Sequence, residues 1–370
     1  MRVLCIASDI LGNRTFGTQL VDALKRVPDV KLDVVRLGPK DMTRSGHRIL
    51  TRFAAPLRVR SVLRELLDDR EPSDYDAVVL GFWEAAAALP EWSRALPTAL
   101  AMDLVPALAL ELSLARTGSA LRRTVKSTAW RVYDHRVRAA LPFVDALLPL
   151  CRWVADGAER SYGTSALPSR VTYVPLDLDK WTPAPRALTG LPKLLFVGNE
   201  FQRKGGDLLL EVFERHLTGV ATLTIASNDP LLSHARLPEG VRVLRGRSRE
   251  QLLLEYRASD LFVLPTRWDI IPNVLAESMA TGLPIVASSV GGIPELVRPG
   301  ISGELMPFDA SADEWGAVVR ELVTDRARLN VLSRGARRLA EDMLGLPRFR
   351  QVVRETLDDL RQLHPPAALQ

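Results

Sequence analysis

The chain is poor in the residues that carry metal or disulfide chemistry. Its two cysteines, Cys5 and Cys151, are too few for a disulfide framework, so we expect each to be a small buried apolar residue. The five histidines are scattered and have no cysteine partner, so the sequence predicts no metal site. The absence of a Gly-x-Gly-x-x-Gly pattern argues against a nicotinamide cofactor, and we expect no cofactor at all.

Long apolar runs are missing too. No window offers about 18 uninterrupted apolar residues, so we expect no membrane-spanning helix. The apolar stretch before Asp9 is too short for a secretory signal. We therefore expect a cytoplasmic protein, or one peripheral to the inner face of the membrane.

Positive charge exceeds negative charge by five, and part of the excess gathers between residues 116 and 138. Read as a helix, this segment has an apolar face opposed by arginines, with Trp130 near its boundary. Such a helix suits either the solvated outside of the first domain, which we favour, or an anionic membrane surface. Nucleic acid is not an expected partner, because the basic residues have no interleaved stacking aromatics.

Strand and helix patterns alternate in both halves of the chain, which is typical of parallel sheets covered by helices on both faces. A chain of 370 residues favours two domains, and the proline-rich stretch 181–192 reads as a linker. The predicted strands are 3–7, 32–37, 77–80, 98–102, 146–150, 171–175, 193–198, 221–226, 241–244, 261–264, 284–288 and 303–307.

The prediction is thus an α/β fold of two doubly wound, Rossmann-like domains that face each other across a cleft. Ligands of such sheets bind outside the carboxyl ends of the strands. The expected domain boundaries are 1–180 for the N-terminal domain, 181–192 for the linker and 193–346 for the second domain.

The most informative segment runs from Pro265 to Pro284. An apolar strand ends at Leu264, and a helical pattern begins near Pro272, which suits a first helical position. Asp269 therefore lies in the loop before the helix, and Glu277 lies inside it. The amides around residues 270–274 point out of the helix N-terminus, where partial positive charge favours an anion.

This arrangement suits a sugar nucleotide. The amides would hold the terminal phosphate, Asp269 would accept hydrogen bonds from sugar hydroxyls, and Glu277 would bind the ribose. Taken alone, the two acids are better explained as a helix cap and a solvated helix residue.

The segment resembles the signature of retaining glycosyltransferases of family 4, the glycosyl transferases group 1. Their donor site has two acids separated by seven residues, then a small-residue helix end, a strand and Gly-Gly-Ile-Pro-Glu. Here these are Asp269, Glu277, 280–282, 283–288 and 291–295. The first acid is more often glutamate in the family. The resemblance implies the GT-B fold, with a C-terminal helix, 347–370, that returns to the N-terminal domain.

The resemblance also implies a phosphate-binding loop at Arg203-Lys204-Gly205-Gly206, whose cations would neutralise a diphosphate leaving group. Many relatives place an arginine directly after the strand glycine, where this chain has Asn199. Arg203 is a candidate substitute for it, or a solvated side chain. The donor-binding residues implied are Gly12, Arg203, Lys204, Asp269, Ile270, Pro272, Asn273, Val274 and Glu277.

Other implied positions depart further from the family. Asp103 follows a strand where many relatives have His-Asp, but Met102 replaces that histidine here. Asp103 is therefore either a cleft-facing catalytic residue, with Lys204 and Asp269, or a helix cap. Residues after neighbouring strands are candidates for the nucleotide base: Asn228, Arg247, Leu264 and Pro265.

The function implied is retaining, metal-independent transfer of a sugar from a nucleoside diphosphate sugar to an acceptor hydroxyl. The acceptor would be a saccharide, a glycolipid or a small metabolite in glycan, polysaccharide or glycolipid biosynthesis. A sugar-nucleotide epimerase of the same fold and a non-catalytic sugar-nucleotide-binding protein are the alternatives; Met102 argues against the epimerase.

Overall fold

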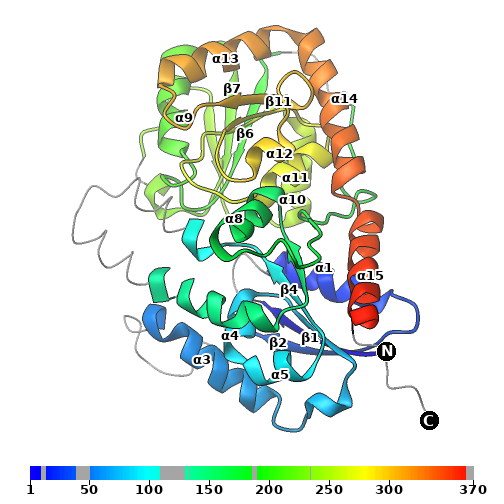
Figure 1. Cartoon of the computed structure of the whole chain (residues 1–370). Helices are drawn as coiled ribbons and strands as arrows, with labels where there is room; N and C mark the ends of the chain where they lie inside the picture. Colours follow the sequence, from blue (N-terminus) through cyan, green and yellow to red (C-terminus); the bar gives the residue numbers. More distant parts are fainter. Residues whose placement is uncertain are drawn as a thin grey trace. The chain divides into compact units, whose positions relative to one another are not determined.

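The computed structural model divides the chain into two compact units, Met1–Pro175 with Pro347–Gln370, and Leu176–Leu346. It describes residues 1–9, 14–38, 51–108, 130–132, 134–185, 190–233 and 235–363. Each unit is a parallel sheet covered by helices (Figure 1). Residues 181–185 and 190–192, from the segment read as a linker, belong to the second unit.

The sheet of the first unit has the strand order β2-β1-β3-β4-β5. All its ladders are parallel, and almost every residue of its inner strands is buried. Because the chain runs from β1 to β2 and then returns to the other side of β1, the strand order reverses between β1 and β3. The bounds are β1 Arg2–Ser8, β2 Lys31–Leu37, β3 Ala77–Leu80, β4 Thr98–Met102 and β5 Ala146–Pro149.

The sheet of the second unit has the order β11-β10-β9-β6-β7-β8, again with parallel ladders. The chain runs from β6 to β8 in one direction and then places β9 on the other edge of β6, so the reversal lies between β6 and β9. The bounds are β6 Lys193–Val197, β7 Thr222–Ala226, β8 Val241–Leu244, β9 Leu261–Leu264, β10 Ile285–Ser288 and β11 Gly303–Met306.

Helices follow most strands, and two of those in the second unit begin with capping boxes. At the start of α13, Ser311 accepts from the amide of Glu314, whose carboxylate accepts from the amide of Ser311. The α-helices are α1 Arg14–Lys25, α3 Thr51–Leu66, α4 Trp83–Ala88, α5 Pro90–Ala95, α8 Arg152–Tyr162, α9 Gly206–Val212, α10 Arg249–Ala258, α11 Asn273–Ala280, α12 Ile293–Leu296, α13 Ala312–Thr324, α14 Arg326–Met343 and α15 Leu346–Leu363.

Eleven of the twelve predicted strands are present, with ends shifted by at most one residue. The strand predicted at 171–175 is wrong. The chain there runs beside β5, and the amide of Thr172 donates to the carbonyl of Pro149. A parallel ladder would also need an amide hydrogen on Pro149, which proline lacks, so the pairing stops at the single bridge between Leu147 and Ser169.

The C-terminal helix α15 packs within the first unit. Phe349 meets Phe16 of α1 edge to face at 5.9 Å between ring centroids. Arg170 forms ion pairs with Glu355 and Asp359 of α15. The apolar positions of the helix, among them Val353, Leu357 and Leu360, are buried.

Candidate functional site

Two loops of the second unit meet at the point where its strand order reverses. One follows β6 and carries Arg203 and Lys204; the other follows β9 and carries Asp269. Because β6 and β9 are paired neighbours, both loops leave the same carboxyl edge of the sheet. This edge is where doubly wound sheets bind ligands.

Backbone contacts fix the two loops against each other. The amide of Arg267 donates to the carbonyl of Arg203 at 2.9 Å. Gly205 has a φ of +75°, and an added Cβ would lie 1.8 Å from the carbonyl oxygen of Pro265. Only glycine therefore allows this approach. Asp229 also fixes the first loop, because its Oδ2 accepts from the amide of Phe201 at 2.6 Å.

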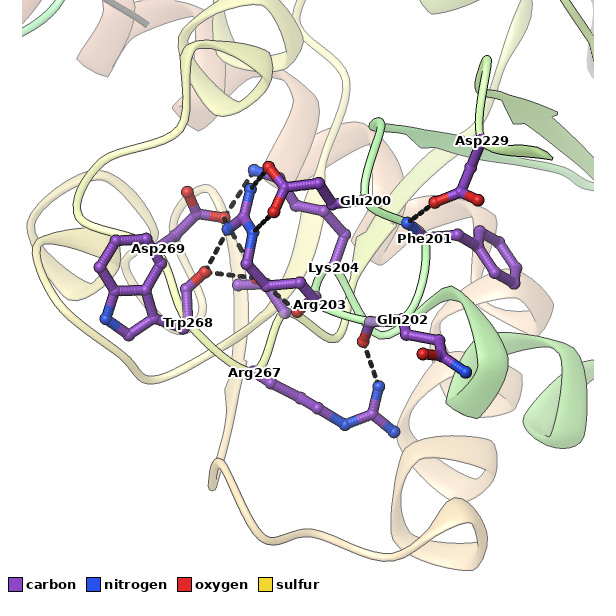
Figure 2. A network of polar contacts seen from close by, with 10 residues as sticks. Glu200, Phe201, Gln202, Arg203, Lys204, Asp229, Arg267, Trp268 and Asp269 are labelled. Atoms are coloured by element: carbon purple, nitrogen blue, oxygen red, sulfur yellow. Dashed lines mark hydrogen bonds and ion pairs between the residues drawn. The ribbon is translucent and has the colours of Figure 1, made fainter. Parts of the chain in front are cut away.

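Lys204 and Asp269 form the central ion pair of this site (Figure 2). Lys204 Nζ lies 2.6 Å from Asp269 Oδ2, and the two side chains are 11% and 13% exposed. The same oxygen accepts from the hydroxyl of Thr266 at 3.1 Å. The structure thus brings together two of the predicted catalytic residues, through a contact that the sequence did not reveal.

Arg203 points into the same cluster rather than into solvent. Its guanidinium donates to both carboxylate oxygens of Glu200, at 2.8 and 3.2 Å, and to the carbonyl of Trp268 at 2.6 Å. It also lies over the Trp268 ring, 5.6 Å from the centroid, and 3.5 Å from Asp269 Oδ2. The hydrogen bond from Arg203 lowers the pKa of the Glu200 carboxyl. Asn199 is structural, since its side chain accepts from the amide of Asn228.

Helix α11 begins directly after the Asp269 loop. Pro272 is its N-cap, with φ −73° and ψ 132°, so the expectation of Pro272 as the first helical residue is wrong by one position. This ψ is extended, and the fixed φ of proline suits both positions. Asn273 and Val274 open the helix, and no side chain caps it. Their amides therefore have no acceptor within the helix.

A second glycine shapes the approach to this helix. Gly291 has a φ of +57°, and a Cβ there would lie 2.2 Å from the carbonyl oxygen of Asp269. The next amide, of Gly292, donates to the carbonyl of Ile270 at 2.6 Å. The Gly-Gly of the Gly-Gly-Ile-Pro-Glu segment thus holds the backbone of the Asp269 loop.

Glu277 lies inside α11 and is 7% exposed. Its Oε1 accepts from Arg249 Nη2 at 2.8 Å and its Oε2 from the hydroxyl of Tyr256 at 3.1 Å. Burial raises the pKa of the Glu277 carboxyl, and the charge and hydrogen bonds of Arg249 and Tyr256 oppose that rise. Arg249 also lies over Trp181, 5.4 Å from the ring centroid. The sequence placed Glu277 but missed its two partners on α10.

The residues predicted to lie near a nucleotide base differ in their surroundings. Asn228 joins two loops, because its Oδ1 accepts from the amide of Gly246 at 2.7 Å. Arg247 is exposed, whereas Leu264 and Pro265 are buried. Leu264 therefore belongs to the core, and Pro265 supports the glycine turn of the neighbouring loop.

In the first unit, Asp103 follows β4, and a residue missed from the sequence follows β3. This is Glu84, at the start of α4, and burial together with the charge of Asp103 raises the pKa of its carboxyl to about 8. The rule that selected Asp103, an acid after a parallel strand, would also have found Glu84. Gly12 lies outside the described residues.

Other predictions meet the structure only in part. Most of the basic segment 116–138 lies outside the described residues. Among the residues that the structure describes, no cluster of three or more His, Cys, Asp or Glu side chains could hold a metal ion. None of the helices in the described ranges is both long and apolar enough to cross a membrane.

Comparisons with known proteins agree with this architecture. Residues 191–325 match the family model of glycosyl transferases group 1. The chain is 30% identical over 297 residues to D-inositol 3-phosphate glycosyltransferase 1 of Catenulispora acidiphila, covering 72% of this chain and 68% of that protein. Alignments with two further proteins of the same description cover 65% and 39% of their lengths.

Solved structures show the same fold. Sucrose-phosphate synthase from Thermosynechococcus elongatus superposes with a TM-score of 0.75 at 17% identity, covering 98% of this chain and 99% of that one. Anabaena HepE in complex with UDP-glucose gives a TM-score of 0.69 at 16% identity, covering 97% and 99%. The resemblance read from the Asp269–Glu277 segment is confirmed: the chain belongs to the group 1 glycosyl transferases and has their GT-B fold of two Rossmann-like units.

Proposed function

We propose that this glycosyltransferase moves a sugar from a nucleoside diphosphate sugar to an acceptor hydroxyl with retained anomeric configuration, in glycan, polysaccharide or glycolipid biosynthesis. The observation that carries the proposal is the convergence of Lys204, Arg203 and the first turn of α11 at the strand-order reversal of the second unit. Support also comes from HepE, a protein of the same fold whose structure holds UDP-glucose.

The cations and the free amides of this site suit a diphosphate leaving group. Lys204 and Arg203 would stabilise the negative charge that grows on the departing phosphate, and the opening amides of α11 would add their partial positive charge. Stabilisation of charge that develops in the transition state accelerates the chemical step itself. Glu277 would accept hydrogen bonds from the ribose hydroxyls, and Asp269 from the transferred sugar.

The proposed step needs no separate base on the protein. The bond between the anomeric carbon and the phosphate oxygen breaks, and the acceptor oxygen bonds to the same face of that carbon. The acceptor proton passes to the departing phosphate oxygen. Two cations beside the phosphate take the place of a divalent ion, so the proposed reaction is metal-independent.

The test is a product assay with the purified protein. UDP-, GDP- and ADP-sugars would be offered in turn, each in excess chelator, with inositol 3-phosphate, oligosaccharides and a lipid extract as acceptors. We expect one donor to give free nucleoside diphosphate and a product whose anomeric configuration, read by NMR, equals that of the donor. An inverted product would contradict retention, and activity only with added metal would contradict metal independence.

A further inference from the structure

The carboxylate of Asp269 has a partner in the structure that a bound phosphate would also need. Lys204 Nζ lies 2.6 Å from Asp269 Oδ2, and Thr266 donates to the same oxygen at 3.1 Å. Both members of the ion pair are largely buried, so water screens their attraction only in part. A phosphate that binds Lys204 must therefore compete with Asp269.

The charges around this pair are balanced. Glu200 and Asp269 carry two negative charges, and Arg203 and Lys204 carry two positive ones, all joined by the contacts drawn in Figure 2. A pyrophosphate brings further negative charge into a cluster with no net positive charge. Favourable binding then requires a change of partners rather than simple addition.

The exchange concerns Lys204 and not Arg203. Arg203 is held by the bidentate contact with Glu200 and by the carbonyl of Trp268, neither of which depends on Asp269. Lys204 has Asp269 as its ion-pair partner. When a phosphate takes the ammonium group, Asp269 loses that partner and needs new hydrogen-bond donors.

We propose that Asp269 makes the site prefer the intact sugar nucleotide over the free nucleoside diphosphate; this inference rests on the proposed function. The hydroxyls of the donor sugar replace Lys204 as partners of Asp269, whereas a free nucleoside diphosphate supplies no such donors. After transfer, Asp269 pairs with Lys204 again and thereby weakens the hold on the product. One carboxylate thus contributes to donor selection and to product release.

Titration calorimetry of Asp269→Asn tests this directly. The probes are UDP with UDP-glucose, GDP with GDP-mannose and ADP with ADP-glucose, and the pair that binds the wild-type protein is used. We expect the wild type to bind the sugar nucleotide more tightly than the diphosphate. Because the neutral amide competes less strongly for the ammonium group than the carboxylate does, Asp269→Asn should bind the diphosphate about tenfold more tightly and reverse the preference.

Two further variants make the result specific. Asp207→Asn is the matched control, because Asp207, in the first turn of α9, pairs with Arg267 of the Asp269 loop rather than with Lys204. It should leave the preference unchanged. Asp269→Glu keeps the charge and should keep the wild-type order of affinities even if Asp269→Asn folds poorly; a reversed order in Asp269→Glu would overturn the proposal.

The possible failures are distinguishable. If the wild type binds none of the three pairs, the proposed function itself is contradicted. If the wild type binds one pair and Asp269→Asn lowers the affinity for both of its ligands equally, Asp269 does not discriminate between them. Only the present inference is then overturned. A lower inhibition constant for the diphosphate product in Asp269→Asn kinetics would support it independently.

Discussion

Asp269 and Glu277 lie in one short segment and each is paired with a basic side chain, but the two pairs are built differently. Asp269 stands in a loop, and one of its oxygens accepts from Lys204 and Thr266. Glu277 stands inside α11, and its two oxygens are held by Arg249 and by Tyr256. In our proposal the loop pair exchanges partners when a ligand binds, whereas both oxygens of Glu277 are already held by protein partners.

The surroundings explain the difference. Burial raises the pKa of Glu277 and the neighbouring Arg249 lowers it, so the charged carboxylate depends on its protein partners. Asp269 lies in a loop among charged groups at the carboxyl edge of the sheet, where a ligand can offer equivalent partners. Two acids of the same motif can therefore have different roles. The following substitutions test the contrast between Asp269 and Glu277.

The largest effect should come from Lys204→Met. Removing the cation that would stabilise the leaving phosphate should lower turnover about 10²–10³-fold. The unfolding transition should move little, because Asp269 keeps the guanidinium of Arg203 and the hydroxyl of Thr266 as partners. Steady-state kinetics with a sugar nucleotide and a denaturation curve measure both quantities. Lys180→Met, which removes the exposed pair with Glu250, is the control and should keep full turnover.

Arg249→Met should affect stability more than Lys204→Met does. It leaves the buried Glu277 without its charged partner, which should cost about 1–3 kcal/mol at pH 8, because Arg249 is itself partly exposed. The pKa of Glu277, already raised in the folded state, should rise further. An acid whose pKa is raised in the folded state binds more protons when folded than when unfolded. The stability of the variant should therefore fall as pH rises above the pKa that Glu277 has in the unfolded chain.

Urea denaturation of Arg249→Met at pH 5 and pH 8 measures this effect. The decrease in unfolding free energy should be smaller at pH 5, where more of the Glu277 carboxyl is protonated. Arg242→Met removes a more exposed pair with Glu255 and should change the unfolding free energy much less at both pH values. A loss of equal size at pH 5 and pH 8 would show that Glu277 does not need Arg249 to carry its charge.

Glu84 supplies the third case, an acid that is affected by the charge of another acid, Asp103. Burial and Asp103 raise the pKa of Glu84 to about 8, from an ordinary value near 4.5. The folded protein therefore binds an extra proton between those values, and its stability falls as pH rises through that window. Glu84→Gln removes the cost of ionising this buried carboxyl. The unfolding free energy of the variant should therefore match that of the wild type at pH 5 and exceed it by about 1 kcal/mol at pH 8.5.

The matched control for that experiment is Glu91→Gln, which changes an exposed acid of the same unit that pairs with Arg64. Its effect on the unfolding free energy should be similar at both pH values. A difference between Glu84→Gln and the wild type that did not grow with pH would contradict the assignment.

Much of the fold could be predicted because buried parallel strands are short, continuous apolar runs such as 77–80 and 261–264. The strand predicted at 171–175 is absent because of its neighbour β5. Pro149 of β5 lies beside this segment and has no amide hydrogen for the ladder. The sequence could not show this before the strands were paired.

Individual residues of the site could be predicted, but the contacts between them could not. Lys204, Asp269 and Glu277 stood out by residue type and position along the chain. Their partners depend on which strands are neighbours: the pairing of β6 with β9 joins Lys204 to Asp269 across 65 positions. Likewise Arg249 and Tyr256 reach Glu277 from α10, at separations for which no local pattern gives a signal.

The most direct test of the account is a crystal structure of the protein soaked with the sugar nucleotide that it binds. We predict the pyrophosphate against Lys204 and the first turn of α11, with Asp269 turned from the lysine to the hydroxyls of the sugar. A pyrophosphate bound away from both Lys204 and α11 would contradict the account.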